Sequence, residues 1–391
     1  MNENKGLVNK TSTMQHVIST FYRKTVASKS EVIAHTGLSP ASVNNLIQSF
    51  VEEGILEETT LGKSSGGRPP MLYKLCDGVF NVLNYSVTAD GIIASICDHN
   101  GNILYSKMLS CKMQGREAFT EAFNKITKEI QANTPLFDTV KAIGMMMPGV
   151  LSYSDCIVTL SNPLKLSKFD VSKMVEETFG KSMNLSLFHD SDALLLGEYF
   201  FGSHKNNSNM AYVYVGKGIG LSIITNDHLF SSDNCGMELG HTVIDMNGEQ
   251  CACGLRGCVN TILGSKNIVD RYLKLSENKV LDISKLDYKR LYELSEEGDE
   301  AALQVIREQI KVLGITLINI VNLLNPGEII LGGDIASVPS MINEVQEFVR
   351  ANSLMPFGKV THVKGSKLDI SCSLMAMAVK ISGELFFRQS I

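Results

Sequence analysis

From residue 78 onward, short apolar segments alternate with longer segments of helical periodicity. The apolar segments are 82–87, 92–97, 142–147, 185–188, 211–215, 221–224 and 328–331, and the helical ones include 117–132, 171–178 and 301–324. Strands that alternate with helices are typical of α/β folds. A chain of 391 residues is longer than a domain with one hydrophobic core usually is. We therefore predict an α/β body of two lobes with a small additional module.

The composition is that of a globular protein without a membrane span. Hydrophobic residues make up 44% of the chain and charged residues 20%. The longest apolar run, 312–324, is interrupted by Thr316, Asn319 and Asn322, and the first seventeen residues lack the apolar stretch of a secretory signal. We expect a cytoplasmic protein whose nine cysteines are reduced.

The first seventy residues contain three segments that we predict to be helices. The first has one apolar face, formed by Met14, Val17, Ile18, Phe21 and Tyr22. The second, at about 30–36, stops at Gly37. The third begins with Ser39 as cap and Pro40 in the first turn, and Gly54 closes it. Two helices joined by a glycine turn are typical of a helix-turn-helix.

The outer face of the third helix is short and polar, which suits contact with base edges in the major groove. The candidate DNA-binding residues of this segment are Ser39, Ala41, Ser42, Asn44, Asn45 and Gln48. Two predicted strands, 55–60 and 71–75, flank a glycine-rich tip with Lys63 and Arg68, which could contact phosphates. This is the pattern of a winged helix, and its alternative is a helical dimerisation or docking domain.

Charge is unevenly distributed along the chain. Residues 1–75 carry eight Lys and Arg against six Asp and Glu, a net charge of +2, and the remaining 28 against 35 give −7. A basic module on an acidic body favours an anionic partner for the module alone, although two charges are a weak signal.

Three of the nine cysteines lie within the eight residues of "CACGLRGC", 251–258. An odd number of cysteines in a reducing compartment indicates a metal site more than a disulfide framework. The alternative is a set of buried or surface thiols without a metal.

Five segments together resemble the ROK family of bacterial sugar-responsive repressors and sugar kinases. They are "MELGHTVIDMNGEQCACGLRGCVN", "HDSDALLLGE", "VGKGIGLSIITNDHLF", "GMMMPG" and "NPGEIILGG". A winged-helix head followed by "GRPP" resembles the repressor branch, because the kinases lack the head. The resemblance implies an N-terminal winged helix-turn-helix at 1–75 and a two-lobed actin-like ATPase or sugar-kinase fold, which is ribonuclease H-like, at 76–391. The smaller lobe would be about 76–198 with helix 375–391, and the larger about 199–374.

The resemblance also implies a structural zinc ion. His241, Cys251, Cys253 and Cys258 would fill all four positions of a tetrahedral site, which leaves none for a reactive water. The second ring nitrogen of His241 would then contact a sugar, as in the family.

The sugar-binding residues that the resemblance implies are Asn162, His189, Asp190, Glu238, His241 and Asn260. Asp190 stands where the kinases have their general base. The alternatives are a turn residue for Asn162 and a helix cap for Asp190. His189 replaces the usual Asn and Asn260 the usual Glu, which puts the identity of the sugar in doubt.

The first phosphate-binding turn of the kinases departs from the family pattern. In "NYSVTADG", Ser86 replaces the Asp that places magnesium and Thr88 replaces a Gly. Phosphoryl transfer depends on positioning and charge neutralisation, so we expect neither ATP binding nor catalysis. Gly216, Gly218, Gly220, Gly332 and Gly333 remain, but close packing demands glycines as readily as a phosphate does.

The sequence therefore predicts a sugar-controlled DNA-binding regulator, a repressor released from operator DNA by a sugar or sugar phosphate. Two alternatives remain: an active sugar kinase with a DNA-binding head, and a DNA-binding protein with a vestigial sugar site. The sugar could also act as a corepressor, or the protein as an activator. A single recognition helix favours a homodimer, or a dimer of dimers.

Overall fold

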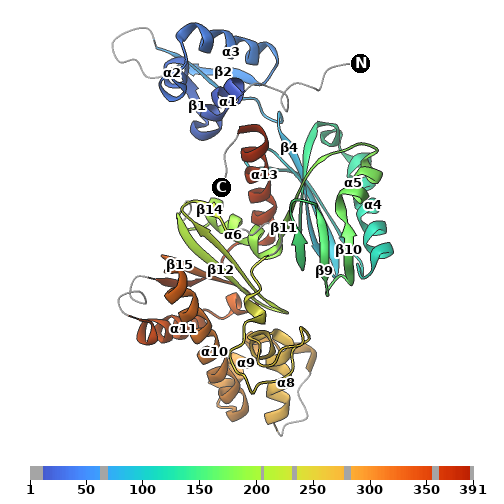
Figure 1. The fold of residues 1–391 in the computed structure, drawn as a ribbon, viewed down its shortest axis with the longest axis vertical. Coiled ribbons are helices and arrows are strands. Elements are labelled where there is room, and N and C mark those ends of the chain that lie inside the picture. Colours follow the sequence, from blue (N-terminus) through green and yellow to red (C-terminus); the bar gives the residue numbers. More distant parts are fainter. Residues whose placement is uncertain are drawn as a thin grey trace. The chain divides into compact units, whose positions relative to one another are not determined.

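The computed structural model describes residues 12–61, 69–203, 207–230, 236–276, 283–354 and 361–387. The chain forms two compact units (Figure 1). The first comprises residues 1–188 and 374–391, and the second residues 189–373. Among the described residues, no helix is both long and apolar enough to cross a membrane.

The first unit begins with three helices and a three-stranded antiparallel sheet of order β1-β3-β2. The elements are α1 (Ser12–Lys24), β1 (Val26–Ser28), α2 (Lys29–Thr36), α3 (Pro40–Glu52), β2 (Leu56–Leu61) and β3 (Met71–Leu75). This order and pairing are those of a winged helix, and we call this part the head. The predicted helices and hairpin strands are present, whereas β1 has no counterpart in the sequence-based prediction. Lys63 and Arg68 lie outside the described residues.

Local signals explain where the helices of the head begin and end. The Ser28 side chain accepts from the Glu31 amide, and the Glu31 carboxylate accepts from the Ser28 amide, which forms a capping box at α2. Gly37 ends α2 in the left-handed conformation with φ 68°. Ser39 caps α3 through the Ser42 amide, and Pro40 is the first residue of the helix.

The remainder of the first unit contains a five-stranded sheet of order β11-β7-β4-β5-β6 and a small sheet of order β10-β9-β8. β4 pairs parallel with β7 and antiparallel with β5. The elements are β4 (Asn81–Thr88), β5 (Gly91–Cys97), β6 (Ile103–Ser110), α4 (Arg116–Asn133), η1 (Pro135–Thr139), β7 (Val140–Met147), β8 (Val150–Ser152), β9 (Ile157–Ser161), β10 (Leu166–Asp170), α5 (Val171–Phe179), β11 (Asn184–His189) and α13 (Ile370–Phe387).

The end of the chain returns to this sheet through α13. The Asn84 side-chain amide on β4 donates to the Leu374 carbonyl at 3.0 Å, and Ile381 lies against Gly144 on β7. A Cβ on Gly144 would lie 2.2 Å from Asn84 Oδ1, so only glycine permits this approach.

The second unit contains a five-stranded sheet of order β14-β13-β12-β15-β16. β15 pairs parallel with β12 and β16, and β13 pairs antiparallel with β12. The elements are α6 (Asp190–Phe201), β12 (Asn209–Val215), β13 (Ile219–Thr225), β14 (His228–Leu229), η2 (Leu239–His241), α7 (Asn260–Leu263), α8 (Ser265–Leu275), η3 (Ile283–Lys285), α9 (Tyr288–Glu296), α10 (Glu300–Leu324), β15 (Glu328–Gly333), η4 (Asp334–Ser337), α11 (Pro339–Asn352) and β16 (His362–Gly365).

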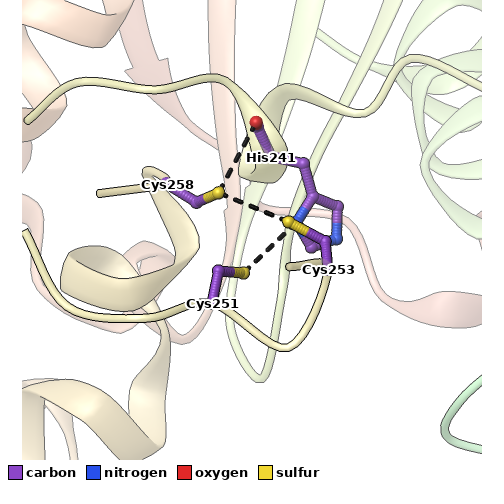
Figure 2. Close-up of side chains that lie close together, drawn as sticks. All are labelled: His241, Cys251, Cys253 and Cys258. Atoms are coloured by element: carbon purple, nitrogen blue, oxygen red, sulfur yellow. Dashed lines mark hydrogen bonds between the residues drawn. The ribbon is translucent and has the colours of Figure 1, made fainter. Parts of the chain in front are cut away.

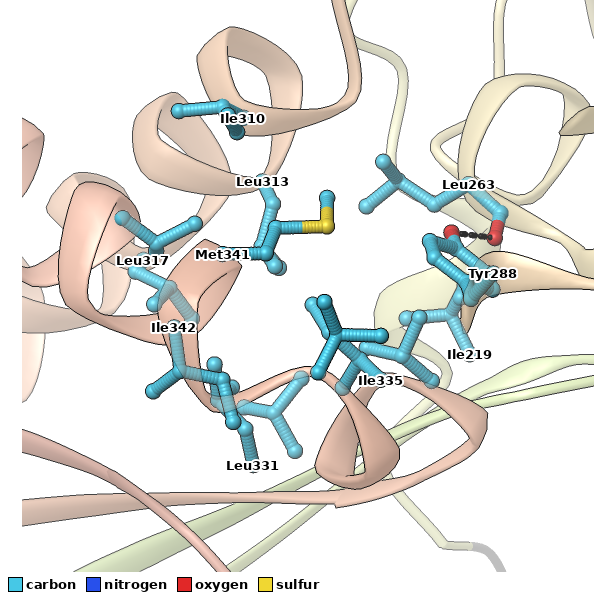
Figure 3. Close-up of a cluster of buried hydrophobic side chains, with 14 of the residues drawn as sticks. Ile219, Leu263, Tyr288, Ile310, Leu313, Leu317, Leu331, Ile335, Met341 and Ile342 are labelled. Atoms are coloured by element: carbon cyan, nitrogen blue, oxygen red, sulfur yellow. Dashed lines mark hydrogen bonds between the residues drawn. The ribbon is translucent and has the colours of Figure 1, made fainter. Parts of the chain in front are cut away.

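The core of the second unit lies between its sheet and the helices α8 to α11. Helix α10 packs against α8, α9 and α11, and α6 packs on β12 and β13. Figure 3 shows side chains of α10 and α11 meeting those of β15 and of the segments around Leu263 and Tyr288. The Tyr288 hydroxyl is fully buried and donates to the Leu263 carbonyl at 2.5 Å, so this tyrosine brings no unsatisfied polar group into the core. The core thereby supports the segments that carry the candidate site.

Candidate effector and metal site

The side chains of His241, Cys251, Cys253 and Cys258 gather at one place in the second unit (Figure 2). Their ligand atoms all lie within 4.8 Å of one another. His241 ends η2, and the three cysteines follow in the loop that leads to α7. The four residues form the metal-ligand cluster.

The spacing of the ligand atoms fits a tetrahedral metal ion. Bonds of about 2.3 Å to sulfur and 2.0 Å to nitrogen place two sulfurs about 3.8 Å apart and a sulfur about 3.5 Å from a nitrogen. Here Cys253 Sγ lies 3.6 Å from Cys258 Sγ, and Cys251 Sγ lies 3.5 Å from His241 Nδ1. The protonation of the thiols also favours a metal ion. Burial and then the neighbouring thiols raise the pKa of Cys258 to about 12, so the clustered cysteines become thiolates only when a cation compensates their charge.

The loop backbone depends on Gly257, which has φ 68°. A Cβ there would lie 1.4 Å from the Asp245 carbonyl oxygen, a contact that no side chain can relieve. Two bonds close the turn between the cysteines, from the Cys251 amide to the Leu255 carbonyl at 2.8 Å and from the Gly254 amide to the Cys251 carbonyl at 3.0 Å. Gly257 therefore has a specific steric reason to be glycine, because only a residue without a Cβ lets the loop fold in this way.

His189 and Asp190 lie at the junction of β11 and α6. His189 is the N-cap residue, and Asp190 is the first residue of the helix. Asp190 Oδ1 accepts from the Ser191 amide at 2.7 Å and lies 3.1 Å from His189 Nδ1. Because the backbone holds only one carboxylate oxygen, the Asp190 side chain is oriented while its Oδ2 stays available to a ligand.

Glu238 and Asn260 lie beside the metal-ligand cluster. Glu238 is exposed and precedes η2, and its carbonyl accepts from the His241 amide at 3.0 Å. A Cβ on Gly240 would lie 3.5 Å from the Asn260 Cβ, so the Glu238–His241 turn packs closely on the start of α7. The Asn260 side-chain oxygen is buried and has no hydrogen-bond partner within the described ranges. Such an acceptor is costly unless a donor reaches it.

Asn162 lies in the first unit, unlike the other candidate sugar-binding residues. It is exposed in the turn between β9 and β10, and its carbonyl accepts from the Lys165 amide at 3.3 Å. The remaining candidates all belong to the second unit.

The hairpin between β4 and β5 contains the two departures from the kinase pattern. Ser86 is buried and pairs with Ile93 on β5 and Met146 on β7. The Thr88 hydroxyl donates to the Gly91 carbonyl at 3.2 Å and accepts from the Asp90 amide at 3.3 Å. The Thr88 side chain therefore stabilises the turn in which it lies.

Three of the remaining glycines, Gly216 after β12 and Gly332 and Gly333 at the end of β15, pack against tyrosines. A Cβ on Gly332 would lie 1.7 Å from the Tyr212 hydroxyl oxygen, and one on Gly216 would lie 2.7 Å from the Tyr214 hydroxyl oxygen. Gly333 has φ 79° and lies against Tyr214 as well. Packing alone therefore accounts for these three glycines.

The polar face of α3 is exposed over its whole length. Ser39, Ala41, Ser42, Asn44, Asn45 and Gln48 are all exposed, whereas Val43, Ile47 and Phe50 on the opposite face are fully buried. Some side chains of this face form hydrogen bonds within the helix. Ser39 Oγ lies 2.9 Å from Ser42 Oγ, and the Gln48 amide donates to Glu52 at 3.0 Å.

Comparison with known proteins places this architecture in one family. The family model described as "ROK family" matches residues 87–379. The chain belongs to the ROK family. A relative named as a putative xylose repressor, from Caldicellulosiruptor sp. (strain Rt8B.4), is 26% identical over 383 residues, which cover 95% of this chain and 96% of that protein.

Solved structures with the same fold include a regulator and a kinase. The crystal structure of a ROK family transcriptional regulator, described as a homolog of the E. coli MLC protein, has a TM-score of 0.81 at 19% identity and covers 96% of this chain and 98% of its own. A Streptomyces griseus ROK family glucokinase with glucose and AMPPNP has a TM-score of 0.64 at 19% identity and covers 76% of this chain and 98% of its own. The predicted fold class is confirmed.

Proposed function

We propose that this protein is a sugar-responsive transcriptional repressor. The observation that carries the proposal is the combination of a winged-helix head, whose third helix exposes its polar face, with a ROK domain in one chain. A relative named as a putative xylose repressor matches 95% of this chain at 26% identity. We assign residues 1–75 to DNA binding and 76–391 to sugar binding, with lobes at about 76–198 plus 375–391 and about 199–374.

We propose that the metal-ligand cluster holds a structural zinc ion. Three soft thiolates and an imidazole at these separations match the ligand preference of Zn²⁺. Four protein ligands complete its coordination, so bound zinc would crosslink η2 to the loop before α7 and would activate no water. His241 faces Cys251 through Nδ1, which leaves Nε2 as the atom with which His241 can reach a sugar.

The sugar site that we propose combines His189, Asp190, Glu238, His241 and Asn260, all of the second unit. A sugar contact of Asn162, in the first unit, stays a prediction from the resemblance. Carboxylates accept from sugar hydroxyls, and amides both donate and accept. The buried, unpaired side-chain oxygen of Asn260 supports a role in taking up a ligand hydroxyl.

We infer that the chain is not a kinase, despite its likeness in fold to a glucokinase. Ser86 offers no carboxylate for a metal ion, and Thr88 fills the turn with a side chain bonded to its own backbone. A coupled ATPase assay with a sugar panel tests this inference. Sugar-dependent turnover above background, lost in Asp190→Asn, would contradict it and favour the kinase alternative.

We propose that the protein binds a palindromic operator as a homodimer, or as a dimer of dimers, in the bacterial cytoplasm, where it is bound to the nucleoid. Sugar binding would alter the spacing of the two recognition helices, which a palindrome sets at about 34 Å. A coupling of about 1–3 kcal/mol between sugar and operator would change DNA affinity roughly 5- to 150-fold.

The test is a DNA-binding titration with the full-length protein. Duplexes selected by the protein from a random pool are titrated by fluorescence anisotropy without ligand and with D-xylose, D-glucose, N-acetyl-D-glucosamine or their phosphate esters. We expect one sugar to weaken DNA binding within the range above. Asn44→Ala with Asn45→Ala should weaken DNA binding itself, whereas Asp190→Asn should keep DNA binding and abolish the sugar response. Unchanged affinity with every sugar would favour a DNA-binding protein with a vestigial site.

A further inference from the structure

A cavity in the second unit lies apart from the candidate sugar and metal residues. Its volume is about 460 Å³, and small-molecule sites in proteins usually measure roughly 300–1,000 Å³. It extends from the end of α6 to the first turn of α11, and strands β12, β15 and β16 contribute to its lining. All residues that line it belong to the second unit. Among the described residues, no candidate sugar-binding residue and no member of the metal-ligand cluster lines it.

Much of the lining of this cavity is buried and apolar. Met210 on β12 and Ile330 on β15 lie on the same face of the sheet, because the two strands pair in register from Met210 and Glu328 onward. Both side chains are buried, as are those of Ile342 on α11 and Val363 on β16, which also line the cavity. Buried hydrocarbon of this kind favours a ligand with an apolar body.

A buried carboxyl group lines the cavity at the end of α6. Glu198 is in the last turn of this helix and is 6% exposed. Its Oε1 accepts a hydrogen bond from the Ser366 hydroxyl at 2.6 Å. Burial, together with the neighbouring Glu328 carboxylate, raises the pKa of Glu198, although the Ser366 bond opposes the shift. A positive group on a ligand would keep this carboxyl ionised, so the cavity favours a ligand that carries one.

Only part of the charge in the lining is compensated within the protein. The charged lining residues are Glu198, Glu328, Lys364 and Lys367. Lys364 Nζ lies 2.8 Å from Glu328 Oε1, so these two residues compensate each other. In the part of the chain that the structure describes, Glu198 and Lys367 form no ion pair, either with each other or with another residue. The lining thus offers one acid and one base to the charges that a ligand brings.

The N-terminus of α11 adds a second positive feature to the lining. The helix is 14 residues long, and Pro339 and Asn343 near its start line the cavity. The N-cap residue Val338 makes no side-chain hydrogen bond to the first-turn amides. A helix N-terminus carries a partial positive charge. Because Lys367 lines the same cavity and is exposed, both features favour a carboxylate on the ligand.

We propose that the cavity is a second ligand site that binds a zwitterion with an apolar body, namely a free apolar amino acid or a short apolar peptide. The ammonium group lies at Glu198, the carboxylate at Lys367 and the N-terminus of α11, and the apolar body on Met210 and Ile330. Neutral sugars lack both charges and phosphate esters lack the positive one, so this cavity selects a different class of ligand from the sugar site. The inference goes beyond the proposed function and does not depend on it.

Calorimetry with the full-length protein tests the ligand class. L-Leucine, L-methionine and L-leucyl-L-leucine are each compared with their N-acetyl derivative, which lacks the positive charge, and with their carboxamide, which lacks the negative one. We expect at least one of these zwitterions to bind, and both of its derivatives to bind roughly tenfold more weakly, because each has lost a charge-assisted contact. Tighter binding of the amino acids or of the dipeptide identifies the ligand within this class.

Two variants test the assigned contacts. Glu198→Gln should weaken binding of the zwitterion roughly tenfold and remove its preference over the N-acetyl derivative, because the amide carries no charge. Lys367→Gln, at an exposed position where the fold tolerates the change, should remove the preference over the carboxamide. Glu308→Gln is the matched control and should bind like the wild type, because Glu308 pairs with Arg271 in the same unit but outside the cavity.

Three results overturn the inference. They are the failure of all three zwitterions to bind at millimolar concentration, equal binding of a zwitterion and its N-acetyl derivative, and wild-type affinity and selectivity in either lining variant. If Glu198→Gln does not fold, Lys367→Gln decides. The sugar titrations with DNA use other ligands, so none of these results bears on the proposed function.

Discussion

The metal-ligand cluster and the head are both small, yet different forces hold them. The loop of the cluster carries exposed apolar side chains, such as Met246 and Leu255, and four polar ligands converge inside it. The head encloses an apolar core that includes Val17, Phe21 and Phe50, none more than 1% exposed. A segment with little apolar surface to bury needs crosslinks. A module in which α1 and α3 each bury an apolar face can rely on the hydrophobic effect. The two regions should therefore respond to different perturbations.

The largest expected effect is at the metal-ligand cluster. Cys258→Ser removes a fully buried ligand, and we expect loss of bound zinc together with rapid proteolysis of the loop at 242–257. Zinc content and limited proteolysis measure both. Cys111→Ser, which changes a half-buried cysteine of the first unit, is the control and should keep the metal. A fully loaded Cys258→Ser protein would show that the cluster is not the site.

A cavity in the core of the head should come next. Phe50 is fully buried on α3, and Phe50→Ala should destabilise the head by about 3–5 kcal/mol, which abolishes DNA binding while zinc stays bound. Chemical denaturation followed by DNA binding and zinc content tests this separation. Gln48→Ala, on the exposed face of the same helix, should change stability by less than about 0.5 kcal/mol. Loss of zinc from Phe50→Ala would mean that the regions are not independent.

The smallest expected effect is at the capping box of α2. Replacement of Ser28 by Ala should cost about 1 kcal/mol. The hydrogen bond from the Ser28 amide, with further bonds from Lys24 and the Ser28 hydroxyl, lowers the pKa of Glu31 to about 2 from its ordinary 4.5. A lowered pKa stabilises the folded state above about pH 4.5, and this stabilisation is lost as the pH falls toward 2.

Glu31 is partly exposed, so solvent screening keeps its contribution below about 1 kcal/mol. Denaturation midpoints of the wild type and Glu31→Gln should differ at pH 6 and converge only as the pH approaches 2. An equal difference at both values would show that the carboxylate charge is not responsible.

Features set by neighbours in sequence were predictable. The helices of the head follow from apolar spacing, from the Ser39 cap and from Gly37, and the structure confirms them. The metal-ligand cluster was predictable because three of its cysteines belong to one short loop, and residues of a short loop necessarily lie close together in space. The resemblance to the ROK family supplied His241 and the sugar residues, whose roles stay predictions, as do the contacts of Lys63 and Arg68.

Features set by distant parts of the chain were not predictable. Strand β1 is three residues long and exists because it pairs with β3, almost fifty residues later. The hydrogen bonds of Ser222 could not be predicted from the sequence. They form only because α6 packs on β13 and brings Ser191 and Asp192 to Ser222. The sequence left open whether Gly332 serves close packing or a phosphate, and the Tyr212 ring that lies against it accounts for it by packing.

By itself, the amino-acid sequence determined the helix ends, the alternation of strands and helices, and the loop that gathers the cysteines, since these depend on dihedral preferences and spacing over a few residues. Only the tertiary structure decided that Ser222 meets Ser191 and Asp192 and why Gly332 lacks a side chain. Both depend on atoms that are brought together by sheet register and helix packing, which act between segments 30 to 120 residues apart.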